Sequence, residues 1–65
     1  MKILLRSYMW ERNLTLRQVE ILTGVSKSTL SRILNNQISP SMDVMERLAS
    51  GLKVRISNLY ESDFK

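Results

Sequence analysis

The chain is 65 residues long and carries ten Lys or Arg against six Asp or Glu, with no Cys and no His. A chain of this length forms a single domain, and without Cys it has neither disulfides nor thiolate metal sites to stabilise it. Its longest apolar run, Ile3 to Leu5, is far too short for a transmembrane helix or for the core of a signal peptide. We therefore expect one soluble cytoplasmic domain at residues 1–65, stabilised by apolar packing or by dimerisation.

The positive charge is concentrated in the first part of the chain. Residues 1–37 contain six Lys or Arg against two Glu, whereas the charges of residues 38–65 cancel. No acidic residue occurs between Glu20 and Asp43, a window that holds two cations. A surface that faces phosphate needs such a window, because a carboxylate there would repel the nucleic-acid backbone. Charge alone indicates nucleic-acid binding no more strongly than a basic surface that only confers solubility.

Helix caps and apolar spacing divide the chain into five short predicted helices, and no strand of appreciable length is expected. The predicted ranges are 2–12, 15–23, 26–35, 41–51 and 56–61. Asn13 and Gly24 suit left-handed helix ends, and the hydroxyls of Thr15, Ser26 and Ser41 can each cap a helix. The predicted fold class is therefore all-α, a compact bundle of five helices.

The second and third predicted helices are joined by Thr23-Gly24-Val25-Ser26, in which Gly supplies the positive φ that a tight turn requires. In helix-turn-helix units of this kind, the first helix crosses the DNA backbone and the second enters the major groove. The helix from Ser26 to Asn35 is thus the candidate for reading DNA.

This third predicted helix has an apolar face and a polar face. One face carries Leu30, Ile33 and Leu34, and the other carries Lys27, Ser28, Ser31 and Arg32. The Arg32 guanidinium can bind guanine O6 and N7 as a fork, and Lys27 can reach the same acceptors or a phosphate. By itself the pattern also fits an ordinary capped helix with a solvated outer face. The Gly turn and the acid-free window together favour DNA.

The segments 14–20 and 23–33 resemble the helix-turn-helix of the phage Cro and repressor (Xre-like) family. The resemblance continues through Ser39-Pro40-Ser41 and Leu52-Lys53-Val54 to about Tyr60, and so covers nearly the whole chain. It implies a five-helix, lambda-repressor-like domain that regulates transcription by binding double-stranded DNA. Such domains are usually dimeric and bind a pseudo-palindromic operator, and repression by occluding a promoter is the simplest outcome.

The resemblance also implies roles for individual residues. The base-reading positions of the family fall on Lys27, Ser28, Ser31 and Arg32. Its contacts with the DNA backbone fall on Thr15, Arg17, Thr29, Asn35, Asn36 and Gln37. We expect no catalytic residue, metal or cofactor, because the chain lacks His and Cys, a carboxylate cluster and a Gly-rich phosphate loop.

Three features depart from the family pattern. Met9 and Leu34 occupy positions that often hold an Arg–Glu ion pair, so apolar packing replaces a buried charge pair. Glu20 stands where Ala is most common, and we expect its carboxylate to reach solvent or a nearby cation. Gly51 and Lys53 stand where Ala and Gly are usual, which predicts a looser end of the fourth helix.

Two further apolar regions are candidate dimer or partner surfaces. Trp10 can anchor a protein partner, although the favoured interpretation is that it folds over Tyr8 as part of a satellite core. The C-terminal residues that can form a dimer seam, as in family dimers, are Ile56, Leu59, Tyr60 and Phe64. They can equally belong to a helix that covers its own core. An alternative function is a protein-interaction module, such as an antitoxin or anti-repressor, which can coexist with DNA binding.

Overall fold

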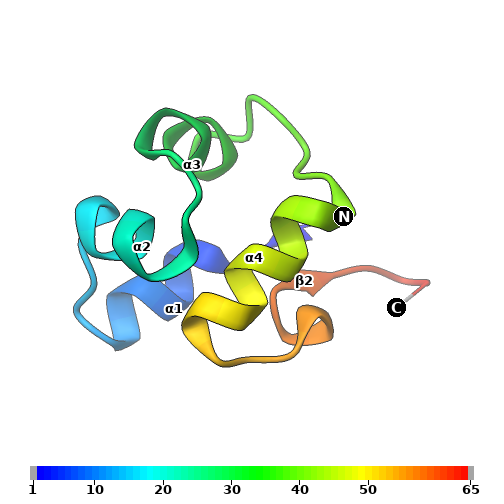
Figure 1. The fold of residues 1–65 in the computed structure, drawn as a ribbon. Coiled ribbons are helices and arrows are strands. Elements are labelled where there is room, and N and C mark those ends of the chain that lie inside the picture. The colour runs from blue at the N-terminus through cyan, green and yellow to red at the C-terminus, as the bar shows by residue number, and fades with distance from the viewer. Residues whose placement is uncertain (1, 65) are drawn as a thin grey trace.

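The computed structural model describes residues 2–64, which form four α-helices, one 3₁₀ turn and a pair of two-residue strands (Figure 1). In chain order these are β1 (Lys2–Ile3), α1 (Leu5–Glu11), α2 (Leu16–Thr23), α3 (Lys27–Leu34), α4 (Met42–Leu52), the 3₁₀ turn η1 (Ile56–Asn58) and β2 (Tyr60–Glu61). None of the helices in this range has the length and apolar character needed to cross a membrane. The predicted domain limits, residues 1 and 65, lie outside the described residues.

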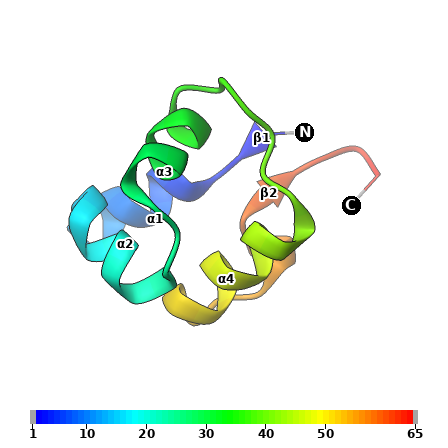
Figure 2. The ribbon, with the colours of Figure 1, turned by 45° about the horizontal axis from the view of Figure 1, so that its top comes forward.

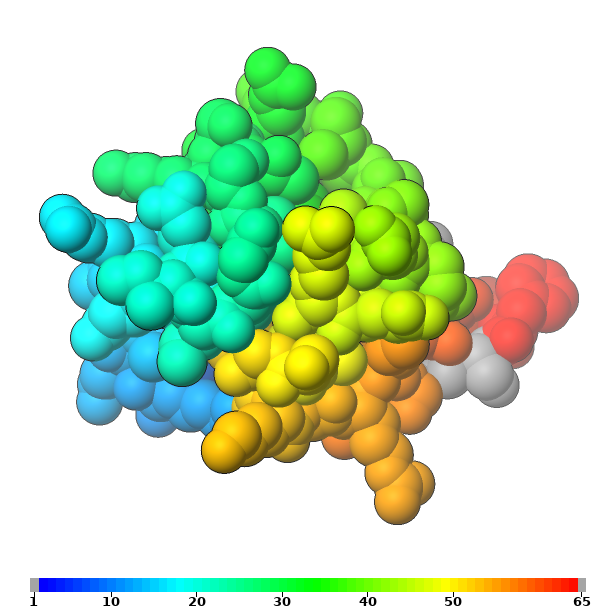
Figure 3. Space-filling view, in the orientation of Figure 1, coloured from blue at the N-terminus to red at the C-terminus, as the bar shows by residue number. Residues whose placement is uncertain are grey.

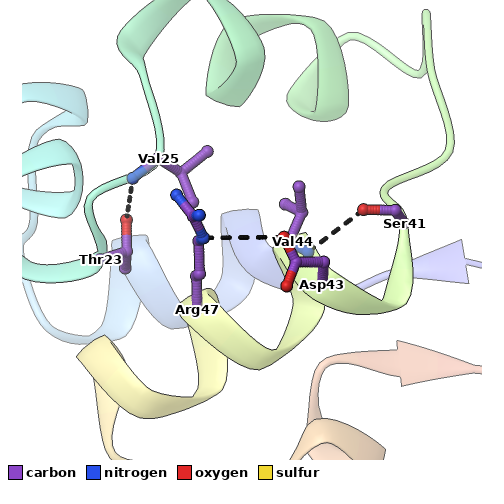
Figure 4. A network of polar contacts seen from close by, with 6 residues as sticks. All are labelled: Thr23, Val25, Ser41, Asp43, Val44 and Arg47. Atoms are coloured by element: carbon purple, nitrogen blue, oxygen red, sulfur yellow. Dashed lines mark hydrogen bonds and ion pairs between the residues drawn. The ribbon is translucent and has the colours of Figure 1, made fainter.

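Helices α2, α3 and α4 begin at the hydroxyl residues that the sequence predicts. Thr15, Ser26 and Ser41 are their N-caps, and each side-chain oxygen accepts the backbone N–H three residues later at 3.2 or 3.3 Å. Figure 4 shows the cap at Ser41. A capping hydroxyl satisfies one of the N–H groups that have no partner within the helix. The three predicted caps are confirmed.

A left-handed residue follows the end of each of the four α-helices, and after α3 this residue is Asn36. Asn13, with φ of 54°, and Gly24, with φ of 73°, follow α1 and α2 as predicted. Lys53 adopts the same conformation after α4, with φ of 58°, although a side chain there costs roughly 1–2 kcal/mol. The N–H groups of Lys53 and Val54 both donate to the carbonyl of Ala49. The end of α4 is thus hydrogen-bonded, contrary to the looser end expected from Lys in place of Gly.

The two ends of the chain differ from the predicted helices. Residues 2 and 3 do not join the first helix but form β1, which pairs antiparallel with β2, with Lys2 opposite Glu61 and Ile3 opposite Tyr60. The predicted helix at 56–61 is wrong, because only the turn η1 is helical and the chain then extends into β2. Strand pairing between the two ends supplies backbone hydrogen bonds that neither segment can make alone. The fold therefore contains four α-helices and a small strand pair within residues 2–64, and a fifth helix is not present there.

Every α-helix contributes to one apolar core. The buried residues are Leu5, Val19, Val25, Leu30, Ile33, Met45, Leu48, Ala49, Leu52 and Leu59. Met9 and Leu34, which replace the ion pair common in the family, are partly buried and pack against this core. Helix α4 contacts both α2 and η1, and both termini lie on the same side of the molecule, beside β1 and β2 (Figures 1 and 2).

Gly51 sets the separation between α4 and α2. A Cβ atom at this position would lie 2.4 Å from the carbonyl oxygen of Leu22 and 2.7 Å from both Cα and Cγ2 of Thr23. Backbone atoms cannot rotate away from such a contact, so only Gly permits this approach. The Gly that departs from the family pattern thus lets α4 pack directly against the end of α2.

Gly51→Ala is expected to lower the free energy of unfolding by about 1–3 kcal/mol, because the added methyl forces α4 away from α2. In a helix without such a contact, Gly→Ala raises the free energy of unfolding by about 0.5–1 kcal/mol. A decrease therefore indicates the close contact between α4 and α2. Urea unfolding measures the difference, with Ser50→Ala at the adjacent exposed position of α4 as the control. An unchanged or raised midpoint for Gly51→Ala would contradict the close approach.

Lys53→Gly is expected to raise the free energy of unfolding by about 0.5–1 kcal/mol, because Gly adopts the left-handed conformation without steric strain. Thermal unfolding followed by circular dichroism measures the change. Lys53→Ala is the matched control, because it removes the charge and keeps the Cβ atom. If both variants stabilised equally, the gain would come from the charge and not from the backbone.

Candidate nucleic-acid interface

The turn between α2 and α3 fixes the direction in which α3 leaves α2. Gly24 supplies the left-handed residue, and Val25 is buried with 4% of its surface exposed. The Thr23 hydroxyl donates to the carbonyl of Val19 at 2.7 Å and accepts the N–H of Val25 at 3.2 Å. Figure 4 shows the second of these bonds. Because the side chain of Val25 and the hydroxyl of Thr23 are both held on the core side, the turn has little freedom to reorient α3.

Helix α3 directs its polar face outward, as the sequence predicts. Leu30 and Ile33 are buried, with 0% and 2% of their surface exposed. Three of the four predicted base-reading residues are exposed, namely Lys27, Ser28 and Arg32. The fourth, Ser31, is half-buried. In Figure 3, α2 and α3 lie side by side on one face of the molecule, and α4 adjoins α2.

Hydroxyl groups cluster at the start of α3. Ser26 Oγ donates to Thr29 Oγ1 at 2.9 Å, and the hydroxyl oxygens of Ser26 and Ser28 lie 3.4 Å apart. Thr29 is half-buried and uses its oxygen as an acceptor, which leaves its own O–H hydrogen free to donate to a phosphate oxygen.

Thr15 and Arg17 lie at the exposed start of α2. The N–H of Thr15 donates to Gln18 Oε1 at 2.8 Å, and its hydroxyl accepts the N–H of Gln18, so the two residues form a capping box. The Thr15 hydroxyl keeps its hydrogen for another acceptor. Together with the Arg17 guanidinium and the free N–H groups of the helix start, it can bind an anion.

The segment Asn35–Gln37 continues from α3 and is held to it through the backbone. The N–H of Asn35 donates to the carbonyl of Ser31 at 3.0 Å, and that of Gln37 donates to the carbonyl of Arg32 at 2.8 Å. Asn36 is left-handed, with φ of 57°. All three side chains in the segment are exposed, so their amides are available at the C-terminal end of α3.

The cations of α2 and α3 form no ion pair within residues 2–64. Arg17, Lys27 and Arg32 are exposed, and none forms an ion pair with a carboxylate among residues 2–64. Elsewhere, Arg47 and Asp43 on α4 form an ion pair, in which Nε and Oδ2 lie 3.9 Å apart (Figure 4). Positive charge is therefore free to act on a polyanion along this face.

Arg6 on α1 and Arg12, the residue directly after α1, instead hold other helix ends. Arg6 donates to the carbonyl of Leu34 at the end of α3 at 3.1 Å. Arg12 donates to the carbonyl of Leu52 at the end of α4 at 2.7 Å, and its guanidinium lies over the Tyr8 ring at 5.2 Å. Cations are stabilised at these C-terminal ends because the carbonyl groups there lack partners and carry partial negative charge. Of the basic residues in the first part of the chain, Arg6 and Arg12 therefore have a structural role, whereas the cations of α2 and α3 form no ion pair within residues 2–64.

Glu20 makes a contact that the sequence did not predict. Its Oε2 accepts the backbone N–H of Lys27 at 2.8 Å in an exposed position, and the carboxylate forms no ion pair with a cationic side chain of residues 2–64. One feature of the sequence could have predicted this contact. A carboxylate is attracted to the start of a helix, and Glu20 precedes α3 by only one helical turn and a short loop. The carboxylate joins α2 to the first residue of α3.

The residues considered for dimer or partner contacts do not form one patch. Trp10 on α1 is 83% exposed, so the expectation that it folds over Tyr8 is wrong. Leu59 is completely buried and is unavailable to a partner. The remaining candidates are exposed Phe64, at 97%, and the half-buried Ile56 and Tyr60, which pack against the core.

A polar helix face held outward by a rigid Gly turn, beside unpaired cations, defines the class of helix-turn-helix DNA-binding domains. The comparisons agree, because the helix-turn-helix family model of the Cro/C1 type matches residues 5–59. The chain belongs to this family, which consists of DNA-binding transcription regulators and not of enzymes. No curated protein and no solved structure matches the chain in the other two comparisons.

Proposed function

We propose that this protein is a repressor that reads a pseudo-palindromic operator by inserting α3 into the major groove. The observation that carries the proposal is the outer face of α3, where the side chains of Lys27, Ser28 and Arg32 are exposed and the two cations form no ion pair within residues 2–64. On the other face, Leu30 and Ile33 anchor the helix in the core. A helix presented in this way fits the major groove and offers side chains to base edges. Occupation of an operator that overlaps a promoter would exclude polymerase.

The proposed base contacts follow from the chemistry of each side chain. Arg32 binds guanine O6 and N7 through two guanidinium N–H groups, and Lys27 binds a guanine acceptor or a phosphate. Ser28 and Ser31 donate or accept at several bases and therefore refine a sequence preference without setting it.

The proposed backbone contacts lie on both sides of α3. At the start of α2, Thr15 and Arg17 bind one phosphate, and Thr29 binds another through its free hydroxyl hydrogen. Past the end of α3, the exposed amides of Asn35, Asn36 and Gln37 bind the opposite strand. Such contacts hold the helix in register and carry no sequence information of their own.

Dimerisation on DNA is the second part of the proposal. Two copies would place their α3 helices in successive major grooves about 34–36 Å apart. Phe64 in the C-terminal tail is 97% exposed and Met42 at the start of α4 is 64% exposed, and both segments lie on the same side of the molecule (Figures 1 and 2). We propose that these two side chains, together with the half-buried Ile56 and Tyr60, form the dimer seam.

An interaction with another protein is the alternative function, and Trp10 favours it. Trp10 is 83% exposed beside a shallow hollow of about 320 Å³ that is lined by Arg6, Ser7, Trp10 and Glu11. Exposed Trp side chains frequently anchor protein complexes. Such a partner would bind on α1 and not on the outer face of α3, so this function is compatible with DNA binding.

Arg32→Ala is expected to weaken binding to the preferred site by about 1–3 kcal/mol and to relax the preference at one base position. Arg17→Ala is its matched control, because the loss of a phosphate contact weakens binding to all sequences and reduces the salt slope by about one unit. Fluorescence anisotropy with specific and scrambled duplexes over a salt series measures both effects. If Arg32→Ala weakened every duplex equally, Arg32 would contact phosphate and the base assignment would be wrong.

Phe64→Ser is expected to weaken self-association by roughly tenfold or more, because about 1.5–3 kcal/mol of apolar burial is lost. Sedimentation equilibrium with and without operator DNA gives the dimer constant. Trp10→Ser is the matched control, since α1 lies on the opposite side of the molecule from the tail in Figures 1 and 2. A larger effect from Trp10→Ser than from Phe64→Ser would place the seam on α1.

A further inference from the structure

The contact between Glu20 and the start of α3 belongs to none of the roles proposed above. Glu20 lies on α2, and its Oε2 accepts the backbone N–H of Lys27, the first residue of α3, at 2.8 Å. The two residues are seven positions apart and are separated by the whole turn. The carboxylate therefore links the two helices directly, in addition to the packing of the core.

This contact adds to the hydrogen bonding of the first turn of α3. Ser26 Oγ accepts the N–H of Thr29, but the N–H of Lys27 has no acceptor within its own helix. Glu20 supplies that acceptor, and its negative charge interacts favourably with the partial positive charge at the helix start. The bond lies at an exposed position of the surface, and Glu20 itself is half-buried.

The carboxylate has two separable effects on DNA binding. Its charge lies at the face that meets phosphate, so it opposes binding to every sequence by a similar amount. Its hydrogen bond holds the end of α3 from which Lys27 and Ser28 project. Loss of the charge alone raises affinity for all duplexes, whereas loss of the hydrogen bond lets α3 shift and reduces discrimination between them.

We infer that Glu20 is a positioning residue for base recognition, whose carboxylate fixes the start of α3 and thereby sets where Lys27 and Ser28 meet the base edges. This inference rests on the proposed function. It places one determinant of sequence preference on α2, outside the helix that contacts the bases.

Three substitutions separate the contact from the charge. Glu20→Gln keeps an acceptor for the Lys27 N–H and removes the charge, and Glu20→Ala removes both. Glu20→Asp keeps the charge but is one methylene too short to retain the bond. Glu11→Gln is the matched control, because it removes an exposed carboxylate from α1 without affecting α3. Ala is common at this position in the family, so Glu20→Ala is expected to fold, and thermal unfolding verifies this for each variant.

The first measurement is hydrogen exchange of the Lys27 amide by NMR in the absence of DNA. Wild type and Glu20→Gln are expected to protect this amide, and protection falls about tenfold in Glu20→Ala and Glu20→Asp. The second measurement is the ratio of affinities for the preferred and scrambled duplexes. We expect Glu20→Gln to keep this ratio while binding both duplexes about two- to threefold more tightly. The ratio should fall about tenfold in both Glu20→Ala and Glu20→Asp.

Equal ratios in Glu20→Gln, Glu20→Ala and Glu20→Asp would overturn the positioning role and leave the proposed function intact. Equal exchange of the Lys27 amide in all variants would also overturn it. If the wild-type protein did not distinguish the two duplexes, the proposed function would fail, and the inference about Glu20 would fail with it.

Discussion

The turn from Gly24 to Ser26 is the constraint on which the rest of the structure depends. It contains one left-handed residue, one buried side chain and one helix cap, and the Thr23 hydroxyl ties it to α2. Because the turn is short and fixed, the burial of Leu30 and Ile33 determines which side of α3 faces solvent. Gly51 then lets α4 pack closely behind α2 and Thr23, which supports the turn from the core side.

The distribution of hydrogen bonds and charge follows from this arrangement. Arg6 on α1 holds the carbonyl end of α3, and Arg12 directly after α1 holds that of α4. A carboxylate on α2 holds the amide end of α3. Helix α3 is therefore fixed at both ends by charged side chains from other helices, in addition to its buried face. The charged side chains of Lys27 and Arg32 take no part in these contacts and are exposed. A rigid helix that presents unpaired donors is suited to base recognition, because little conformational entropy is lost on binding.

The features that the sequence predicted correctly depend on local signals. The caps at Thr15, Ser26 and Ser41 and the left-handed Gly24 each involve residues within one helical turn, and the faces of α3 follow from the helical period. The features it missed involve distant partners. The pairing of β1 with β2, the bonds of Arg6 and Arg12, and the close approach at Gly51 join segments whose proximity depends on the whole fold. The exposure of Trp10 could not be predicted either, because it depends on the positions of the neighbouring helices.

The central claim is that α3, presented by this turn, reads a symmetric DNA site. Selection of binding sites from random duplex DNA at about 150 mM salt tests it most directly, since non-specific phosphate binding is weakened there. The account predicts enrichment of a two-fold symmetric site whose half-sites lie about ten base pairs apart. No enrichment by a well-folded protein would contradict it and would transfer the functional assignment to a protein partner on α1.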